Sequence, residues 1–270
     1  MPVIKANNST EKYQYIAQYL SHRNELTGRG GDIELTKLRA KYVRSNIMDL
    51  NLNLQKVVDV GCGDASFLIE INDIFEHSIG ILPTASEVAA VNRILKHENL
   101  SIEIKEGLTT QIPEEDRSID LIICNSVLHG VGFNPELVDR SFLEFKRVLK
   151  TDGILYIGEI PETNELSGRN YGTSITKYMV WTIRNRGLKA FWGQTVSLLR
   201  SFLTHSLYIL QPTNMFYENN TEFRERLTRN GFEVIQVYES KLNEKIEIES
   251  EIKARRLDYI CRLRGRLGRN

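Results

Sequence analysis

Short runs of β-branched and aliphatic residues alternate with helix-like segments along the middle of the chain, and this alternation restricts the fold more than any other feature. The strand-like runs are residues 56–60, 78–82, 101–105, 119–124 and 154–157, and the helix-like segments between them are residues 64–75, 85–97 and 135–149. Strands joined by helices form a mostly parallel sheet with both faces covered. Ligands of such sheets bind where the strands end, so the residues after each strand are the candidates for a site.

The alternation is preceded by helical patterns and followed by a long interruption. Apolar residues recur at helical spacing from Tyr13 to Leu20, and a second helical stretch covers residues 33–50. A helix near residues 221–229 and two strands, 233–238 and 257–263, resume the pattern, and we expect those two strands to pair antiparallel at the sheet edge. The sequence predicts four parts: an N-terminal helical cap (1–52), a core (53–161), a helical insertion (162–220) and a C-terminal part of the core sheet (221–270).

A glycine-containing loop follows the first strand of the core, at residues 61–63 (GCG). Glycines there allow a tight turn and close approach to a ligand, although an ordinary strand–helix turn is the structural alternative. The carboxylates of Asp59 and Asp64 flank the loop, and they would repel the pyrophosphate of a dinucleotide. Ser66 also stands where the dinucleotide fingerprint has its third glycine. The loop therefore favours a cationic ligand with an ammonium and a sulfonium group, which describes S-adenosylmethionine (SAM).

Together with this loop, three further segments resemble the class I SAM-dependent methyltransferases, nearest to the broad group that includes ubiquinone/menaquinone-pathway enzymes. The four segments are VVDVGCGDASFL, GILPTASE, EGLTTQIPEEDRSIDLIICNSVLHGV and FKRVLKTDGILYIGE. The resemblance extends over residues 13–263 in the order of elements. It implies an α/β fold with a doubly wound, seven-stranded and mostly parallel sheet whose last strand is antiparallel. It also implies methyl transfer with SAM as the cofactor.

The resemblance also implies a set of cofactor-binding positions. They are Asp59, Gly61, Cys62, Gly63, Asp64, Leu82, Gly107, Leu108, Asn125, Ser126 and Tyr19. Tyr19 would close over the site from the N-terminal helix, and core packing is its alternative role. Relatives usually carry an acidic residue where this chain has Leu82, and often one where it has Leu108. Nearby polar residues that would substitute for them are Thr84, Ser86, Glu87 and Thr109. These two departures leave open a protein that retains the fold without the cofactor.

Two residues are candidates for the base that removes a proton from a hydroxyl acceptor. His129 follows the fourth strand, and histidine titrates near neutral pH; its alternative role is a hydrogen bond within the loop. Glu159 follows the fifth strand, and its alternative role is a salt bridge at the strand end. The sequence has no His, Asp and Glu cluster with ligand spacing, so we predict no metal site.

The net charge of zero conceals a separation of charge along the chain. Residues 166–217 contain six Lys and Arg, no Asp or Glu, and many aromatic residues, and residues 253–270 carry a second basic cluster. For the first segment three interpretations are open: a lid packed on the core, a site for an anionic substrate such as a phosphorylated or nucleotide-linked sugar, and an interfacial helix over residues 175–210 on an anionic membrane. No nucleic-acid recognition motif accompanies either cluster.

The sequence therefore favours a SAM-dependent methyltransferase acting on a small-molecule or glycan-type acceptor, with oxygen as the nucleophile. One alternative is a lipid-like or quinone-like acceptor at a membrane surface, and another is a non-catalytic binding partner that kept the fold. The start of the chain has no apolar signal core, no apolar run reaches about 20 residues, and the three cysteines lie far apart. These features predict a cytoplasmic protein, with peripheral membrane attachment as the alternative.

Overall fold

The computed structural model describes residues 33–50, 55–98, 100–128, 135–162, 218–240 and 255–264, and short helical pieces at 180, 183–184, 187–189, 191–193, 195–196 and 199. The helices are α2 (Ile33–Met48), α3 (Ser66–Ile71), the 3-10 turn η1 (Asn72–Ile74), α4 (Ala85–Glu98), α6 (Pro135–Val148) and α8 (Asn220–Arg229). The strands are β1 (Lys56–Val60), β2 (His77–Leu82), β3 (Ile102–Glu106), β4 (Ile119–Asn125), β5 (Leu149–Glu162), β6 (Phe232–Glu239) and β7 (Arg255–Leu263).

The strands form one seven-stranded sheet in the order β3-β2-β1-β4-β5-β7-β6. Strands β1 to β5 pair in parallel, whereas β7 runs antiparallel to both β5 and β6. The predicted fold class is therefore confirmed, including the antiparallel last strand. The order of strands reverses between β1 and β4, which puts the end of β1 at the switch point where doubly wound sheets bind ligands.

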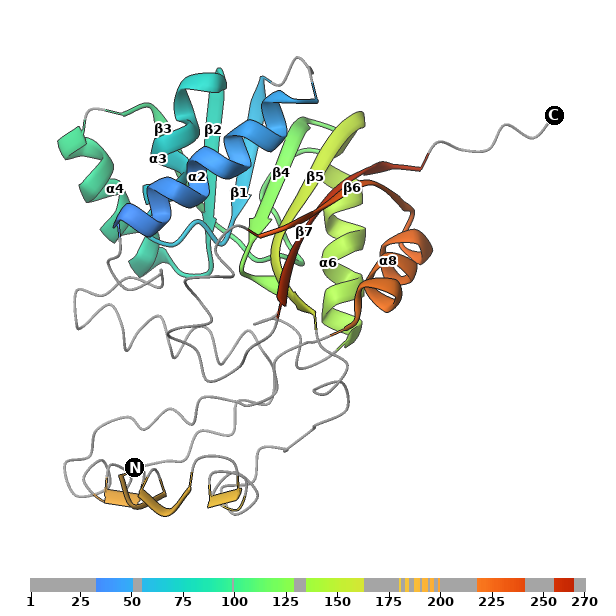
Figure 1. The fold of residues 1–270 in the computed structure, drawn as a ribbon. Coiled ribbons are helices and arrows are strands. Elements are labelled where there is room, and N and C mark those ends of the chain that lie inside the picture. Colours follow the sequence, from blue (N-terminus) through green and yellow to red (C-terminus); the bar gives the residue numbers. More distant parts are fainter. Residues whose placement is uncertain are drawn as a thin grey trace.

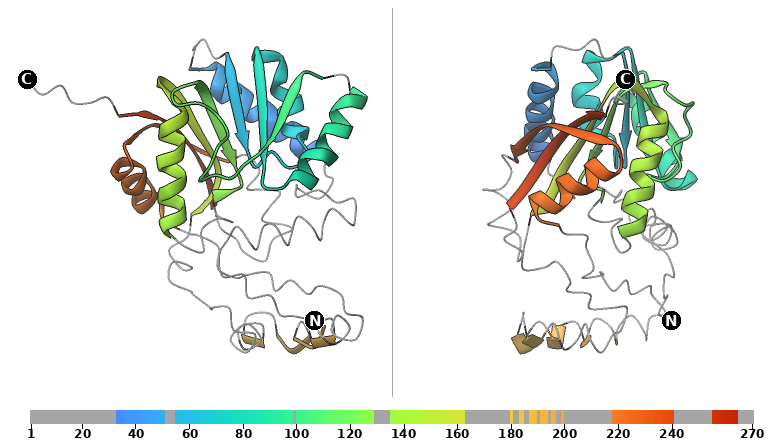
Figure 2. Two further views of the ribbon diagram at one scale, coloured as in Figure 1. Left: turned by 180° about the vertical axis from the view of Figure 1, so that it is seen from behind. Right: turned by 90° about the vertical axis from the view of Figure 1, so that its right-hand side faces the viewer.

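Helices cover both faces of this sheet (Figures 1 and 2). Successive residues of a strand point to opposite faces, so Val57 belongs to the core under α2, α3 and α4, whereas Val58 belongs to the core under α6 and α8. The described pieces between residues 180 and 199 lie beyond the carboxyl ends of the parallel strands β1 to β5 in all three views. Within the described residues, no helix has the length and apolarity needed to cross a bilayer.

Two elements differ from their predicted bounds by more than two residues. The predicted helix at 64–75 is split, because Ala65 has a left-handed backbone and α3 ends in the 3-10 turn η1. Strand β5 starts earlier and ends later than predicted: Leu149 already pairs with Ile119, and the strand continues past a bulge after Ile157. The predicted helix around Tyr13–Leu20 and most of the predicted insertion lie outside the described residues.

Candidate cofactor site

The loop after β1 has a backbone that favours glycine. The φ angles of Gly61, Gly63 and Ala65 are 81°, 58° and 62°, so three residues out of five are left-handed. The amide of Gly61 donates to the carbonyl of Ile81 at the end of β2 (2.9 Å). A Cβ atom added at Gly61 would lie 2.5 Å from Cγ2 of Val127, which follows β4. The loop is therefore held between the ends of β2 and β4, with no space for a side chain at its first glycine.

Three carboxylates lie near this loop, and each of them affects the pKa of the Cys62 thiol. Burial raises the pKa of Cys62, and the nearby charges of Asp59, Asp64 and Glu87 raise it further. Asp64 accepts a hydrogen bond from the amide of Ser66 (3.0 Å), and Glu87 is buried in the first turn of α4. The loop thus lies in a region of negative potential, which suits a cationic ligand and opposes a pyrophosphate.

Asp59 is the most distinctive of these carboxylates. It is 3% exposed, and no described residue forms a hydrogen bond or ion pair with its side chain. Burial raises its pKa to about 7, and its charge also raises the pKa of Cys124 on β4, which burial alone already increases. A buried carboxylate without a protein partner is costly. A cationic ligand beside it would remove that cost, so the residues present fit SAM.

Leu82 ends β2 and Leu108 follows β3, and these are the two positions where the resemblance implies acidic residues. Leu82 is buried and its carbonyl accepts the amide of Gly107 (2.8 Å), while Leu108 forms a tight turn with Gln111. Glu87, in the first turn of α4, accepts a hydrogen bond from the Thr84 hydroxyl (3.0 Å) two residues after β2, and its charge raises the pKa of Cys62. Of the suggested substitutes, Glu87 is therefore the one placed beside the glycine loop.

Thr109 and Ser86, the other suggested substitutes, have different neighbours. Thr109 is buried and accepts a hydrogen bond from Ser141 of α6 (2.8 Å), so its hydroxyl ties the loop after β3 to that helix. Ser86 lies within hydrogen-bonding distance of Thr84 (3.1 Å) at the exposed start of α4. Neither contact points to a ligand.

Asn125 and Ser126 end β4 at the same edge of the sheet. Ser126 has a φ of 59°, and its amide donates to the carbonyl of Gly158 on β5 (2.9 Å). The side-chain oxygen of Asn125 accepts two hydrogen bonds from the guanidinium of Arg39 on α2, from Nε (3.1 Å) and Nη2 (2.7 Å). Both predicted residues therefore lie beside the glycine loop, and one of them is held by a residue from outside the core.

Arg39 connects Asn125 to a buried polar cluster. Its Nη1 donates to Asp258 of β7 (2.6 Å), and Asp258 also accepts the Tyr156 hydroxyl (2.7 Å) and the amide of Glu159 (2.8 Å). Burial by itself lowers the pKa of Arg39. The negative charge of Asp258 and the hydrogen bonds around the guanidinium have a larger opposite effect, so the pKa of Arg39 is raised overall. Arg39, Tyr156, Glu159 and Asp258 are all fully buried, so each charge among them needs an opposite charge close by.

Glu159 belongs to this cluster. Its side chain is fully buried, its φ is 62°, and its carboxylate lies 3.6 Å from Nε of Arg39 and 3.4 Å from Nη1 of Arg256. Two arginines and two carboxylates, Glu159 and Asp258, thus neutralise one another. This geometry favours the salt-bridge alternative for Glu159, and its role as a base stays a prediction.

Two predicted site residues, Tyr19 and His129, lie outside the described residues. His129 directly follows Leu128, which is buried at the end of the segment after β4. In the described part of the chain, no group of three or more His, Cys, Asp and Glu side chains is arranged to hold a metal ion.

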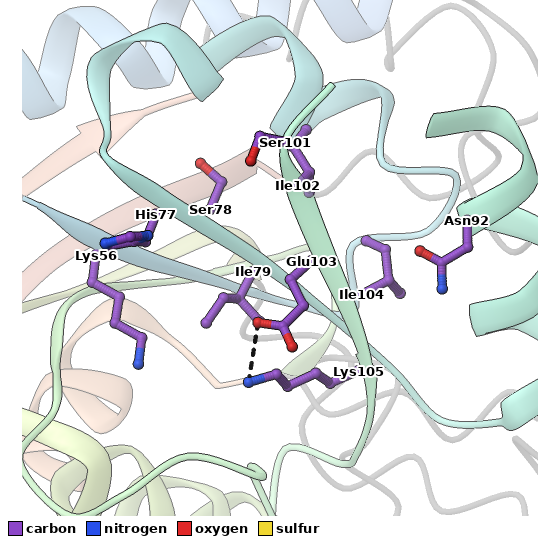
Figure 3. Close-up of a pocket in the computed structure, with 10 residues that line it drawn as sticks. All are labelled: Lys56, His77, Ser78, Ile79, Asn92, Ser101, Ile102, Glu103, Ile104 and Lys105. Carbon is purple, nitrogen blue, oxygen red and sulfur yellow. Dashed lines mark ion pairs between the residues drawn. The ribbon is translucent and has the colours of Figure 1, made fainter. Parts of the chain in front are cut away.

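A cavity of about 620 Å³ lies along the edge strand β3 and the amino ends of β1 and β2 (Figure 3). It includes the ion pair between Lys105 and Glu103 (3.2 Å). Its lining residues are Lys56, His77, Ser78, Ile79, Asn92, Ser101, Ile102, Glu103, Ile104 and Lys105. None of them is a predicted cofactor residue, so this cavity is separate from the glycine loop.

Arg39 and Asp258 are two residues of this region that were not predicted from the sequence. Each has a weak signal in the sequence: Arg39 falls beside Ala40 and Val43 on the buried side of α2, and Asp258 interrupts the apolar run of β7. A charged residue in an apolar stripe predicts a buried partner. The two residues are 219 positions apart, so the sequence alone could not identify the pair.

Comparison with known families tests the resemblance. Residues 58–157, which run from β1 to β5 and include the glycine loop, match the family model described as a methyltransferase domain. The chain contains a class I SAM-dependent methyltransferase domain. Its cofactor is SAM, and the carboxylates around the loop agree with a cationic donor. No curated protein matches the sequence of this methyltransferase significantly.

Solved structures share the methyltransferase fold at low sequence identity. Phosphoethanolamine N-methyltransferase 1 of Haemonchus contortus, in complex with phosphoethanolamine and S-adenosylhomocysteine, has a TM-score of 0.61 at 13% identity, covering 99% of this chain and 51% of that one. Magnesium protoporphyrin IX methyltransferase of Synechocystis PCC 6803, with bound S-adenosylhomocysteine, has a TM-score of 0.56 at 14% identity, covering 93% and 99%. The cyclase SpnF has a TM-score of 0.61 at 14% identity, covering 97% and 98%.

Proposed function

We propose that this methyltransferase methylates an oxygen of a small, anionic acceptor, such as a phosphorylated or sugar-linked compound. The observation that supports the anionic acceptor is the charge of residues 166–217, which contain six Lys and Arg and no Asp or Glu. This segment follows β5, and its described pieces lie beyond the carboxyl ends of the parallel strands, on the side of the glycine loop (Figure 1). The Haemonchus enzyme also binds a phosphorylated compound, phosphoethanolamine, in its solved structure.

The cofactor side of the proposal rests on β1. When bound, SAM supplies a methyl group activated by a sulfonium sulfur. The positive φ angles of Gly61 and Gly63 give the loop its tight turn, and Asp59, Asp64 and Glu87 provide the negative potential that the positive charges of SAM require. Together these residues hold and orient the cofactor, which is the principal contribution a protein makes to an in-line displacement.

The acceptor side needs a group that takes the proton of a hydroxyl. We assign this role to His129, because in the sequence it comes shortly after Asn125 and Ser126 at the end of β4. Histidine changes charge near neutral pH and accepts a proton readily. Glu159 is the weaker candidate, because Arg39 and Arg256 already neutralise it.

Methyl transfer from labelled SAM to matched acceptors tests the anionic acceptor. The panel pairs hydroxyl compounds that differ only in a phosphate, for example glucose and glucose 6-phosphate. We expect kcat/KM to be at least about tenfold higher for the phosphorylated member, since charged hydrogen bonds contribute roughly 1.5–3 kcal/mol. Replacing Arg184, Arg186 and Lys189 by Gln should reduce this preference.

The matched control replaces Arg264, Arg266 and Arg269 of the C-terminal basic cluster by Gln. This variant removes the same number of charges and should keep the preference of the wild type. Equal rates with both members of each pair, or methylation at nitrogen instead of oxygen, would count against the proposal while leaving the methyltransferase domain itself unaffected.

A second candidate acceptor is lipid-like and lies at a membrane surface. Among the exposed apolar side chains of the insertion are Leu188 (65%), Trp192 (64%), Val196 (58%) and Leu199 (57%). Their spacing of four, four and three residues puts them along one side of a helix. An exposed apolar stripe in a basic segment without acidic residues is typical of interfacial helices on anionic bilayers.

Sedimentation with vesicles tests this second candidate. We expect vesicles of phosphatidylglycerol and phosphatidylcholine to pellet the protein at low salt, and about 0.5 M salt to release most of it. Replacing Trp192 by Ser should weaken pelleting, whereas Ile235→Ser, at an exposed apolar position on β6, should not. Absence of pelleting at low salt would rule out the membrane alternative and leave the soluble acceptor.

A further inference from the structure

Arg39 fixes the orientation of the Asn125 side chain. Both Nε and Nη2 of the guanidinium donate to the same oxygen, Oδ1 of Asn125, at 3.1 and 2.7 Å. On its other side the guanidinium is anchored by Asp258, at 2.6 Å from Nη1. Arginine has donors and no acceptor, so only the oxygen of the amide can face it. A rotation of the amide by 180° would oppose N–H groups to N–H groups and lose two charge-assisted hydrogen bonds.

The surroundings of the pair leave little freedom. A Cβ atom at Gly158 would overlap both Oδ1 of Asn125 and Nη2 of Arg39, so this position of β5 accommodates the pair because it is glycine. The next residue, Ser126, is fixed to β5 through the carbonyl of Gly158. The amide of Asn125 is therefore preorganised by α2, β5 and β7 together.

Because Arg39 occupies the oxygen of the Asn125 amide, the two N–H groups of that amide face away from Arg39. No described residue accepts a hydrogen bond from them, and Asn125 is partly exposed at the end of β4. Because Val127 contacts the glycine loop, Asn125 lies at the edge where the cofactor loop and the end of β4 meet. With its oxygen occupied, Asn125 can only donate to a reactant there.

We propose that Arg39 is a positioning residue that makes Asn125 a donor toward the attacking atom of the acceptor, and that Asn125 thereby selects oxygen over nitrogen nucleophiles. A neutral amine has one lone pair, which must form the new bond to carbon, so it cannot also accept from Asn125. A hydroxyl oxygen has two lone pairs: one forms the bond to the methyl carbon and the other accepts the hydrogen bond. The carbon–sulfur bond breaks with its electron pair left on sulfur, and the hydroxyl proton passes to the base.

The inference rests on the proposed oxygen methylation, and a pair of cofactor analogues tests it without any acceptor. S-Adenosylhomocysteine lacks the transferred methyl, whereas sinefungin carries an ammonium group near that position. The readout is the ratio of their dissociation constants from calorimetric titration. In Asn125→Asp, a carboxylate replaces the donor and keeps Arg39 paired, so we expect sinefungin to gain about tenfold or more relative to S-adenosylhomocysteine.

Arg39→Lys tests the positioning role. A single ammonium does not hold the amide oxygen with two donors, so the amide can turn its oxygen toward the ligand, and sinefungin should gain roughly threefold in relative affinity. The control is Arg44→Lys on the same helix, where the arginine pairs with exposed Asp73, and its ratio should match the wild type within twofold.

Two results would overturn the inference. One is an unchanged ratio in Asn125→Asp, which retains the ion-pair partner of Arg39 and decides the question even if Arg39→Lys does not fold. The other is wild-type protein that methylates 2-aminoethyl phosphate faster than 2-hydroxyethyl phosphate. A shifted ratio together with absence of methyl transfer to any oxygen acceptor would instead refute the proposed function and leave the orientation of Asn125 intact.

Discussion

The Asp59→Asn variant is expected to be more stable than the wild type without ligand and to bind SAM more weakly. In the wild type the Asp59 carboxyl is buried without a described partner, and burial raises its pKa to about 7. An amide at this position removes the cost of an ionised group in the core. It also removes a charge that attracts the cationic cofactor, so we expect affinity for SAM to fall roughly 10- to 100-fold.

The stability difference should depend on pH with a defined sign. The pKa of an aspartate in the unfolded chain is about 3.8 and that of folded Asp59 is about 7. The contribution of this group to stability is therefore fully present below about pH 3.8 and is lost as the pH rises through about 7. The advantage of Asp59→Asn should grow between pH 4 and 7 and then stay constant at about 4 kcal/mol, because the two pKa values differ by about 3.2 units and each pKa unit corresponds to about 1.4 kcal/mol.

Denaturant unfolding across this pH range and calorimetric titration with SAM measure the two effects. Asp120→Asn is the matched control, since Asp120 is a carboxylate on β4 that pairs with Lys150 (2.6 Å) near the opposite edge of the sheet. It should lose stability and keep its affinity for SAM. An Asp59→Asn variant that is destabilised at pH 8, or that binds SAM as tightly as the wild type, would refute the placement of Asp59.

The second large effect is expected for Asp258→Ala. Asp258 is fully buried and accepts hydrogen bonds from Arg39, Tyr156 and the amide of Glu159. Its removal leaves the positive charge of Arg39 without its closest partner inside the core. Breaking such a buried pair costs about 3–5 kcal/mol. We therefore expect a loss of that size in the free energy of unfolding, measured by denaturant titration.

Asp73→Ala provides the comparison, because the partner of Asp73, Arg44, lies on α2 as Arg39 does. Asp73 pairs with Arg44 of α2, and both side chains are exposed, so its loss should cost less than about 1 kcal/mol. Asp258→Asn should be intermediate, because the amide keeps the shape but loses the charge. A cost for Asp258→Ala that equals the cost for Asp73→Ala would show that the buried cluster does not stabilise the fold.

Much of the fold followed from local patterns. β-Branched runs separated by helical segments predicted the parallel strands, because the period of apolar residues differs between strands and helices. The errors lie where tertiary contacts prevail. Lys150 to Gly153 have the composition of a turn, but β5 includes them because Leu149 pairs with Ile119 across a bulge. Ala65 is left-handed although it is not a glycine, which shortens α3.

The candidate site was predictable only in part. Asp59 and the glycines next to it are adjacent in the sequence, so their pattern could be recognised. The environment of Asn125 could not be predicted from the sequence, because it depends on Arg39 from α2 and on Asp258 from β7. Such contacts between distant segments exist only after the sheet has formed. The same holds for Glu87, whose position beside Cys62 depends on how α4 starts after β2.

Titration of the wild-type protein with SAM at pH 7, in two buffers of different ionisation enthalpy, tests the central claim most directly. Binding beside Asp59 should produce a saturable heat and release about half a proton more from the wild type than from Asp59→Asn, since a carboxyl with a pKa of about 7 is half protonated at that pH. Absence of binding at millimolar SAM, or identical proton release from both proteins, would contradict the account.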